Sequence, residues 1–510
     1  MAYLLGLDIG TSGTKTVLVD ETGKLVGRAL HEYPLLTPRP SWCEQDSQEW
    51  WAAVVATVRQ VLAEAGVSGD EVSAVGLSGQ MHGSVFLDAR DEIIRPTILW
   101  CDQRTQAECD WITEAVGAET VVAETCNPIL TGFQAPKIIW VRDNEPDNYE
   151  QIRKVLLPKD YIRLLLTGEY ATEVSDASGT CLLNVPQRRW SDVILDRTGI
   201  PREWLPEVHE SQEVSGKITE AAAAATGLRA GTPVVGGGGD QAAGAVGNGI
   251  VETGVVSSTV GTSGVVFAYL DEPLMDAKLR TQTFCHAVPG KWHVMGVVQS
   301  AGGSLRWMRD TLCQVEKSRA AESGRDAYEY MTEAAAALPT SEGLIFLPYL
   351  TGERAPYPNP NAKGVFFGLT IRHTKAHMVR AVLEGVAMAM RDSFEIMKAM
   401  GTTFRQVRAS GGGARSKFWR QIQADVTGEP HVTINVDEGP AFGVALLAGV
   451  GCGIFSSVAE ACRETIAVVD ELGPQPSERQ RYEGYYRLYR ELYPRLEKSF
   501  DAAQALVENE

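Results

Sequence analysis

Two aspartates of this sequence adjoin glycine-rich turns, where a carboxylate can act on a closely held ligand. Asp8 ends the apolar segment "YLLGLD" and precedes a GTSG turn, and Asp240 follows four glycines in "VVGGGGDQAAGAVG". Glycine allows close backbone approach and positive φ, so Asp240 is a candidate general base. Asp8 at a strand end is a candidate ligand of Mg²⁺, directly or through water. The structural alternatives are an Asx turn for Asp8 and a helix N-cap for Asp240.

The tetrapeptide GTSG occurs twice, at residues 10–13 and 261–264, about half a chain apart and both times after an apolar run. Such a turn offers backbone amides and two hydroxyls, a set that binds anions without cationic side chains. A simple hairpin turn is the alternative for either copy alone, but two copies predict a clamp on one polyphosphate. Lys15 follows the first copy, yet no glycine precedes it and a strand follows, so this is not a Walker A loop.

Three more glycine-flanked segments hold candidate ligand-binding residues. "SGQMHG" places Met81 and His82 in a loop after a strand, where His82 can bind a polyol hydroxyl and Met81 can pack on its carbons. "QSAGGSLRW" and "ASGGGARS" each open a helix, which suits a flat ring or a phosphate, or else close helix packing. "LWCDQR" either lines the same pocket or forms an ion pair.

The elements that must position these residues repeat between the two halves. The pattern predicts strands over residues 3–8, 15–20 and 24–33, a helix from Asp46 to Gly66 and a strand over 72–79. The second half again shows strand, GTSG turn and strand, and then a long helix over 374–401. A glycine-rich boundary separates predicted domains 1–247 and 248–510, and the tail from Glu478 reads as a structural amphipathic helix.

Bulk composition excludes several classes of protein. A chain of 510 residues with a formal charge of −18 favours a soluble, multidomain protein over one that binds nucleic acid or an anionic membrane. The nine scattered cysteines form no CxxC pair and indicate reduced thiols in the cytoplasm. The first residues lack a basic stretch and read as a strand, not a signal peptide, and no apolar stretch is long enough to span a membrane.

Taken together, these segments resemble the FGGY family of carbohydrate kinases over nearly the whole chain. "GVFFGLTIRHTKAHMVRAVLE" fits a family signature throughout, and "GFQAPKIIW" fits another except at Gln134. "SGQMHG", "LLPKDYIRLLLTGEY", "SDASGT" and "FLPYLTGERAP" look most like the members that phosphorylate D-xylulose. The resemblance implies an α/β fold of two actin-like (ribonuclease-H-like) domains with a catalytic cleft between them.

The resemblance also implies roles for individual residues. Asp240 is the catalytic base. Asp8 is the other catalytic residue, an acidic side chain near Mg²⁺ and the γ-phosphate of ATP. The sugar-binding positions are Met81, His82, Asp240 and Gln241. The nucleotide-binding positions are Thr11, Ser12, Gly13, Lys15, Gly261, Thr262, Gly302, Arg306, Gly412, Gly413 and Lys417. Because phosphoryl transfer has a loose transition state, a nearly ordinary pKa of Asp240 would suffice.

The expected reaction is ATP-dependent phosphorylation of D-xylulose to D-xylulose 5-phosphate in the cytoplasm. Gln241 and Cys101 stand where many D-xylulose kinases have Asn, so ribulose, gluconate, glycerol or another polyol is an alternative substrate. Alternatives of other classes are a sugar-independent actin-like ATPase and an idle sugar-binding regulator. The partners are a small sugar and ATP, with no nucleic acid or membrane, and similar proteins are commonly homodimers. The sequence does not indicate a role for the loop 352–356.

Overall fold

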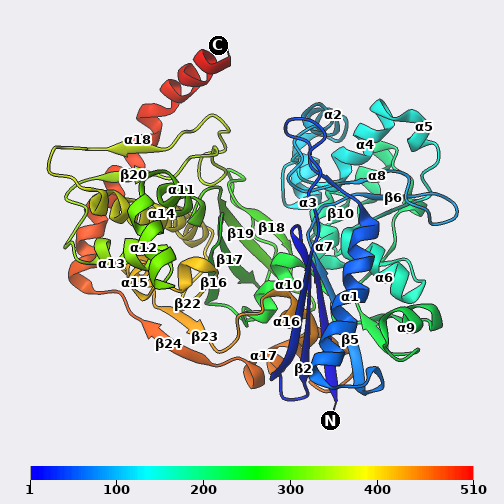
Figure 1. Cartoon of the computed structure of the whole chain (residues 1–510). Coiled ribbons are helices and arrows are strands. Elements are labelled where there is room, and N and C mark those ends of the chain that lie inside the picture. The colour runs from blue at the N-terminus through cyan, green and yellow to red at the C-terminus, as the bar shows by residue number, and fades with distance from the viewer. Residues whose placement is uncertain (1, 509–510) are drawn as a thin grey trace.

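The computed structural model describes residues 2–508, which form two α/β bodies side by side (Figure 1). The N-terminal sheet has the strand order β13-β14-β5-β1-β2-β3, with β15 also paired to β5. Its strands are β1 (Tyr3–Ile9), β2 (Gly13–Asp20), β3 (Leu25–Glu32), β5 (Val72–Gly79), β13 (Val214–Lys217), β14 (Pro233–Val235) and β15 (Gly238–Gly239). Its flanking helices are α1 (Ser47–Ala65), α6 (Pro158–Thr167) and α9 (Glu220–Thr226).

The predicted helix α1 begins and ends where its capping residues indicate. The Asp46 side chain accepts a hydrogen bond from the backbone N–H of Gln48, and Gly66 is left-handed at the C-terminus. Between β5 and β13 the chain adds a layer of short elements. Its helices are α2 (Gln106–Val116), α3 (Ala118–Thr125), α4 (Gln134–Asn144), α5 (Pro146–Tyr149), α7 (Val174–Ala177) and α8 (Asp192–Thr198). The two-stranded sheets there are β6 (Val85–Leu87) with β8 (Lys154–Leu156), β9 (Ala171–Glu173) with β12 (Glu207–His209), and β10 (Leu183–Asn184) with β11 (Arg189–Trp190). A further strand, β7 (Thr97–Ile98), pairs with β4 (Glu44–Gln45), which comes before α1 in the chain.

The second sheet repeats the design of the first. Its order is β18-β19-β17-β16-β22-β23-β24, formed by β16 (Val255–Val260), β17 (Gly264–Leu270), β18 (Gln282–Cys285), β19 (Trp292–Val298), β22 (Gln406–Ser410), β23 (His431–Ile434) and β24 (Val468–Leu472). In both sheets the strand before the GTSG turn pairs antiparallel with the next strand and parallel with a later one, β5 or β22. The recurrence of GTSG therefore reflects two related domains, each with one such hairpin, and the expected two-domain actin-like α/β fold is confirmed.

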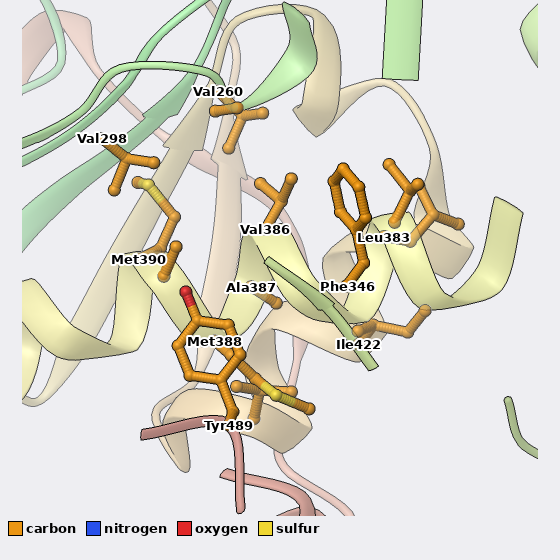
Figure 2. Close-up of a cluster of buried hydrophobic side chains, with 14 of the residues drawn as sticks. Val260, Val298, Phe346, Leu383, Val386, Ala387, Met388, Met390, Ile422 and Tyr489 are labelled. Atoms are coloured by element: carbon orange, nitrogen blue, oxygen red, sulfur yellow. The ribbon is translucent and has the colours of Figure 1, made fainter. Parts of the chain in front are cut away.

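A hydrophobic core lies between this second sheet and its helices (Figure 2). The helices are α11 (Gly302–Leu312), α12 (Gln314–Ser323), α13 (Ala327–Ala336), α14 (Lys375–Ala399), α15 (Lys417–Thr427) and α18 (Pro476–Glu508), and a small sheet joins β20 (Ile345–Leu347) to β21 (Val365–Phe367). Helix α17 (Val458–Thr465) belongs to a separate cluster with α16 (Pro440–Gly451). Val386 and Met390 of α14 lie near Val260 and Val298 in Figure 2. Tyr489 of α18 is 1% exposed, so the predicted tail helix is part of this core.

Two helices join the bodies. Helices α10 (Asp240–Gly247) and α16 (Pro440–Gly451) pack on each other between the sheets (Figure 1). A Cβ on Gly6 or Gly76 would lie 1.9 or 2.0 Å from a carbonyl oxygen of α16, so these glycines let α16 lie directly on the N-terminal sheet. The predicted boundary follows residue 247, the last residue of α10, yet α16 lies beyond it and packs on the first sheet. No helix within residues 2–508 combines the length and apolar character that a membrane crossing needs.

Candidate active site

The two predicted catalytic aspartates line one pocket of about 290 Å³ between the sheets. Asp8, Lys15, Asp240 and Gln241 line it from the N-terminal body. From the other body come side chains and backbone of β16, β17 and the loops after β22 and before α16: Ser257, Thr259, Val265, Phe267, Ser410, Gly411, Asp437, Glu438 and Gly439. Both bodies therefore contribute acidic residues to the pocket lining, and Lys15 contributes a cation.

Asp8 lies at the end of β1, opposite Lys15 of β2 in the strand register. Its Oδ1 atom is buried and has no hydrogen-bond partner among the described residues. Burial raises the pKa of Asp8 to about 6, although the nearby Ser78 hydroxyl and then the Lys15 cation lower it. A buried carboxylate oxygen without a partner is poised to receive one from a ligand.

Asp240 is the first residue of α10, at the junction between β15 and the helix. Its Oδ1 accepts a hydrogen bond of 3.2 Å from Nε2 of Gln241. Burial, and then the negative charge of Asp8, raise the pKa of Asp240 to about 7. The pKa is thus well above the ordinary value that the sequence argument considered sufficient, because Asp240 shares a poorly solvated pocket with a second acid.

A buried polar network holds the glycines that precede Asp240. Ser175 Oγ accepts a hydrogen bond of 3.1 Å from the Gly239 N–H and donates one of 2.9 Å to Glu173. Arg163 donates to the carbonyl oxygens of Val235 and Gly236 at 2.8 and 2.5 Å. These contacts fix the backbone on which Asp240 stands. The sequence analysis assigned no role to them, although charged residues inside the apolar helix "PKDYIRLLLT" signal a buried ionic network.

The first predicted phosphate turn, Thr11 to Gly13, is anchored by side chains from distant segments. The Thr11 carbonyl accepts from Gln45 Nε2 at 2.6 Å, and its hydroxyl accepts from Trp100 Nε1 at 2.9 Å. Ser12 is exposed and free to meet a ligand. A Cβ on Gly13 would lie 2.6 Å from the carbonyl oxygen of His31, so this glycine is required by packing against β3.

The "LWCDQR" segment forms the predicted ion pair, and none of its residues is among those that line the pocket. Trp100 contacts the first turn, as described, while Arg104 and Asp102 form a buried ion pair of 2.7 Å. The Arg104 guanidinium also lies 3.6 Å from the ring centre of Trp42. Burial raises the pKa of the Cys101 thiol to about 12, so this cysteine is not a nucleophile near neutral pH.

The structure brings the second turn and α11 together. The N–H groups of Gly302 and Gly303 donate to the carbonyl oxygens of Gly261 and Thr262 at 2.8 and 2.9 Å. Arg306 reaches the Thr262 hydroxyl at 3.3 Å. A Cβ on Gly302 would lie 2.3 Å from the Gly261 oxygen, so the glycines at the start of α11 serve close packing against the turn.

The third glycine turn lies beside the second. Thr259 and Ser410, at the ends of β16 and β22, share a hydrogen bond of 2.7 Å, and Gly413 packs on Val260. Gly412 is exposed, and nothing lies within 4 Å of a Cβ placed on it, which leaves room for a ligand. Lys417, the first residue of α15, extends into solvent and lies 3.6 Å from Asp470. The second and third glycine turns thus follow the same ends of the neighbouring strands β16 and β22.

Lys15 contacts a carboxylate that the sequence analysis missed. Its Nζ lies 2.6 Å from Oε2 of Glu438, which also pairs with Arg28 at 2.8 Å. Glu438 is 5% exposed and belongs to the loop before α16. This pairing joins residues far apart in the sequence, and no local pattern indicates it.

Met81 lies beside Gly239, the residue before Asp240, but neither Met81 nor His82 is among the residues that line the pocket. Met81 is 4% exposed and lies where a Cβ on Gly239 would approach its side chain within 2.9 Å. His82 has a left-handed backbone with φ of 69°, held by Lys137, whose Nζ donates to the His82 carbonyl at 2.8 Å. Burial, and next the Lys137 cation, lower the pKa of His82 to about 3.

The neutral His82 ring has a defined donor and acceptor. Its Nδ1 lies 2.7 Å from the carbonyl oxygen of Gly179, which can only accept, so Nδ1 carries the proton. Nε2 therefore holds a lone pair that can accept a hydrogen bond from a hydroxyl. The ring is half-buried beside Phe133, with ring centres 4.8 Å apart.

The comparisons with known proteins agree with this geometry. Models of the N-terminal and C-terminal domains of the FGGY family of carbohydrate kinases match residues 3–247 and 256–452. The chain belongs to this family. It is 40% identical to a xylulose kinase of Escherichia coli (strain K12), over 96% of this chain and 99% of that one. It is 33% identical to a gluconokinase of Bacillus subtilis (strain 168), over 88% and 87% of the two chains.

A solved structure shows the same architecture. The ligand-bound xylulose kinase of Lactobacillus acidophilus is 27% identical and superposes with a TM-score of 0.91 over 98% of this chain and 100% of that one. The protein is accordingly a carbohydrate kinase with ATP as its phosphoryl donor. The resemblance stated from the sequence is confirmed.

Proposed function

We propose that this kinase transfers the γ-phosphoryl group of ATP to the C5 hydroxyl of D-xylulose, giving D-xylulose 5-phosphate. The observation that carries the proposal is that Asp8 and Asp240 line one pocket between the two hairpin-bearing sheets. The near full-length similarity to a xylulose kinase supports the choice of sugar. The similarity to a gluconokinase keeps gluconate as the second candidate substrate.

In the proposed mechanism Asp240 is the general base. As the sugar oxygen attacks the γ-phosphorus in line, Asp240 accepts the hydroxyl proton and the bond to the β,γ-bridging oxygen breaks, releasing ADP. The buried network from Arg163 to Gly239 keeps the Asp240 carboxylate in place, and preorganised geometry is most of the catalysis in such reactions. Lys15 and the amides of the two turns stabilise the charge on the phosphates.

The acidic end of the pocket fits a magnesium ion bound with ATP. Asp8 offers a buried carboxylate oxygen without a partner, and hard oxygen donors are the ligands that Mg²⁺ prefers. The described residues contain no cluster of three or more metal-binding side chains, which suits an ion held by one or two carboxylates together with phosphates and water. When bound, Mg²⁺ neutralises phosphate charge. Asp8 would hold the ion, directly or through water.

The sugar would occupy the other end of the pocket. His82 Nε2 accepts a hydrogen bond from a sugar hydroxyl, Met81 covers the carbon chain, and Gln241 supplies an amide beside Asp240. The nucleotide would lie along the second sheet, between the turn at Gly261 and the open face of Gly412.

The position of the phosphate tests the proposed reaction directly. Product formed from D-xylulose and Mg-ATP is isolated and its phosphorus-to-proton couplings are measured by NMR. Coupling to the two C5 protons is expected, whereas coupling to the C1 protons or no phosphorylated sugar contradicts the proposal. We also propose a cytoplasmic location and a homodimer. Light scattering measured as the protein elutes from a size-exclusion column tests the homodimer.

A further inference from the structure

The loop that carries Arg354 is fixed beside the pocket. Glu353 and Asn359 exchange two backbone hydrogen bonds of 3.0 Å, and the Ala355 N–H donates to the Val297 carbonyl at 3.2 Å. Val297 lies opposite Val265 in the strand register, and Val265 lines the pocket that holds Asp8 and Asp240. The backbone of Arg354 is therefore one residue away from a contact with β19, and the neighbouring strand β17 lines the pocket.

A buried carboxylate makes this loop rigid. Glu353 is 3% exposed, and its Oε1 accepts hydrogen bonds from the N–H groups of Gln299 and Arg354, at 3.0 and 2.7 Å. The Arg354 main chain is thus held from both sides. The segment "YLTGERAP" had no role in the sequence analysis, and its hydrogen bonds now give its backbone a structural one.

The Arg354 side chain, in contrast, has no partner. It is half-buried, and within residues 2–508 its guanidinium makes no hydrogen bond or ion pair. Other arginines with little exposure are paired: Arg104 with Asp102, Arg163 with backbone carbonyls, Arg380 with Glu384, and Arg420 with Asp470. The five N–H donors of a guanidinium lose hydrogen bonds to water when it is partly buried, and without a protein acceptor this loss costs free energy. The arrangement indicates that a ligand supplies the acceptors.

Arg354 lies close enough to His82, a proposed sugar-binding residue, for its charge to affect that imidazole. Besides burial and Lys137, the Arg354 cation contributes to the low pKa of His82. The second sheet also lies near His82, since the ring centres of Phe284 in β18 and of His82 are 6.2 Å apart. Strand β18 pairs with β19, and β19 accepts the hydrogen bond from the Ala355 N–H. The His82 acceptor and the Arg354 donors are thus complementary to a polyol that carries both hydroxyl protons and lone pairs.

We propose that Arg354 is a substrate-binding residue that the C-terminal body contributes to the sugar site, where its guanidinium donates hydrogen bonds to an oxygen of the sugar. The proposal rests on the proposed kinase function of the same pocket. It gives the sugar a contact from each body.

Substitution of Arg354 separates sugar binding from nucleotide binding. Arg354→Gln is expected to raise the KM for D-xylulose at least about 10-fold, the effect of losing a hydrogen bond from a charged donor, while the KM for ATP changes less than about twofold. Arg354→Lys keeps the positive charge but loses the planar arrangement of guanidinium donors, so we expect an intermediate KM for D-xylulose. Arg372→Gln is the matched control, since Arg372 is exposed in the same body and pairs with Glu342.

Calorimetric titration of sugar without nucleotide gives a second readout, and the melting temperature shows whether each variant is folded. An unchanged sugar KM and sugar affinity in a folded Arg354→Gln protein would overturn the proposal. A raised KM for ATP alone would instead make Arg354 a phosphate contact and also reject it. If the wild-type protein does not turn over D-xylulose, the proposed reaction fails separately, and calorimetry with the sugar that it does bind still decides the role of Arg354.

Discussion

The negative charge of Asp8 raises the pKa of Asp240 across the pocket between the two sheets. Burial alone would disfavour the ionised form of either carboxylate, and their proximity adds to that effect for Asp240. The base of this kinase is therefore partly protonated near neutral pH in the free protein. Cations that enter with ATP would favour the ionised form and so couple nucleotide binding to activation of the base.

The pH dependence of the reaction follows from this pKa. Only ionised Asp240 can accept the hydroxyl proton, and its pKa is raised to about 7, so kcat/KM for the sugar is expected to fall as pH decreases through about 7. Initial rates between about pH 5.5 and 9, with coupling enzymes in excess, measure the profile. A flat profile down to about pH 5.5 would contradict an essential base with this pKa.

Removal of the Asp240 charge is expected to stabilise the fold at alkaline pH. The native pKa lies above the unfolded one, so ionisation opposes folding, and this cost grows as pH rises from about 4 to about 7 and is constant above. Asp240→Asn removes that cost. Its melting temperature should exceed that of the wild type at pH 8 by a few degrees and approach it at pH 5. A lower melting temperature at pH 8 would show that the carboxylate is structurally required.

His82→Asn tests the proposed acceptor for the sugar. Asparagine tolerates the left-handed backbone at this position, where φ is 69°, so the loop should keep its shape. Loss of the Nε2 acceptor is expected to raise the KM for the sugar about 10-fold with little change for ATP. His31→Asn, on an exposed strand position, serves as the control. Equal effects on both substrates would indicate a disturbed pocket and not a lost contact.

Two glycines of the nucleotide side should respond differently to alanine. Gly302→Ala would place a Cβ 2.3 Å from the Gly261 oxygen, so we expect a clearly lower melting temperature. Gly412→Ala meets nothing within 4 Å and should fold normally while raising the KM for ATP. Thermal unfolding and ATP kinetics of both variants distinguish packing from ligand contact. An unaffected KM for ATP in Gly412→Ala would move the nucleotide away from this turn.

Local sequence patterns were sufficient for the hairpins and the main helices. The GTSG turns, the capped helix after Asp46 and the tail helix with Tyr489 all lie where periodicity and turn residues predicted them. Glycine-rich turns marked Asp8 and Asp240 as candidates one by one, and the structure places both in one pocket.

Contacts between distant segments could not be predicted in the same way. Lys15 pairs with Glu438, and Arg163 supports the glycines before Asp240, but neither partner is near in the sequence. The raised pKa of Asp240 depends on burial and on Asp8, which only the assembled pocket sets. Helix α16 packs on the first sheet through Gly6 and Gly76. The sequence does not predict this contact because the helix lies far from both glycines along the chain.

The most direct test of the central claim is ADP production by wild type and Asp240→Asn with Mg-ATP and a panel of sugars. The panel holds D-xylulose, D-ribulose, L-ribulose, L-xylulose, D-fructose, gluconate and glycerol. We predict the highest kcat/KM with D-xylulose and a kcat at least about 10²-fold lower in folded Asp240→Asn. A preference for another polyol would reject D-xylulose, and sugar-independent ATP turnover that Asp240→Asn retains would contradict both the proposed sugar phosphorylation and the role of its base.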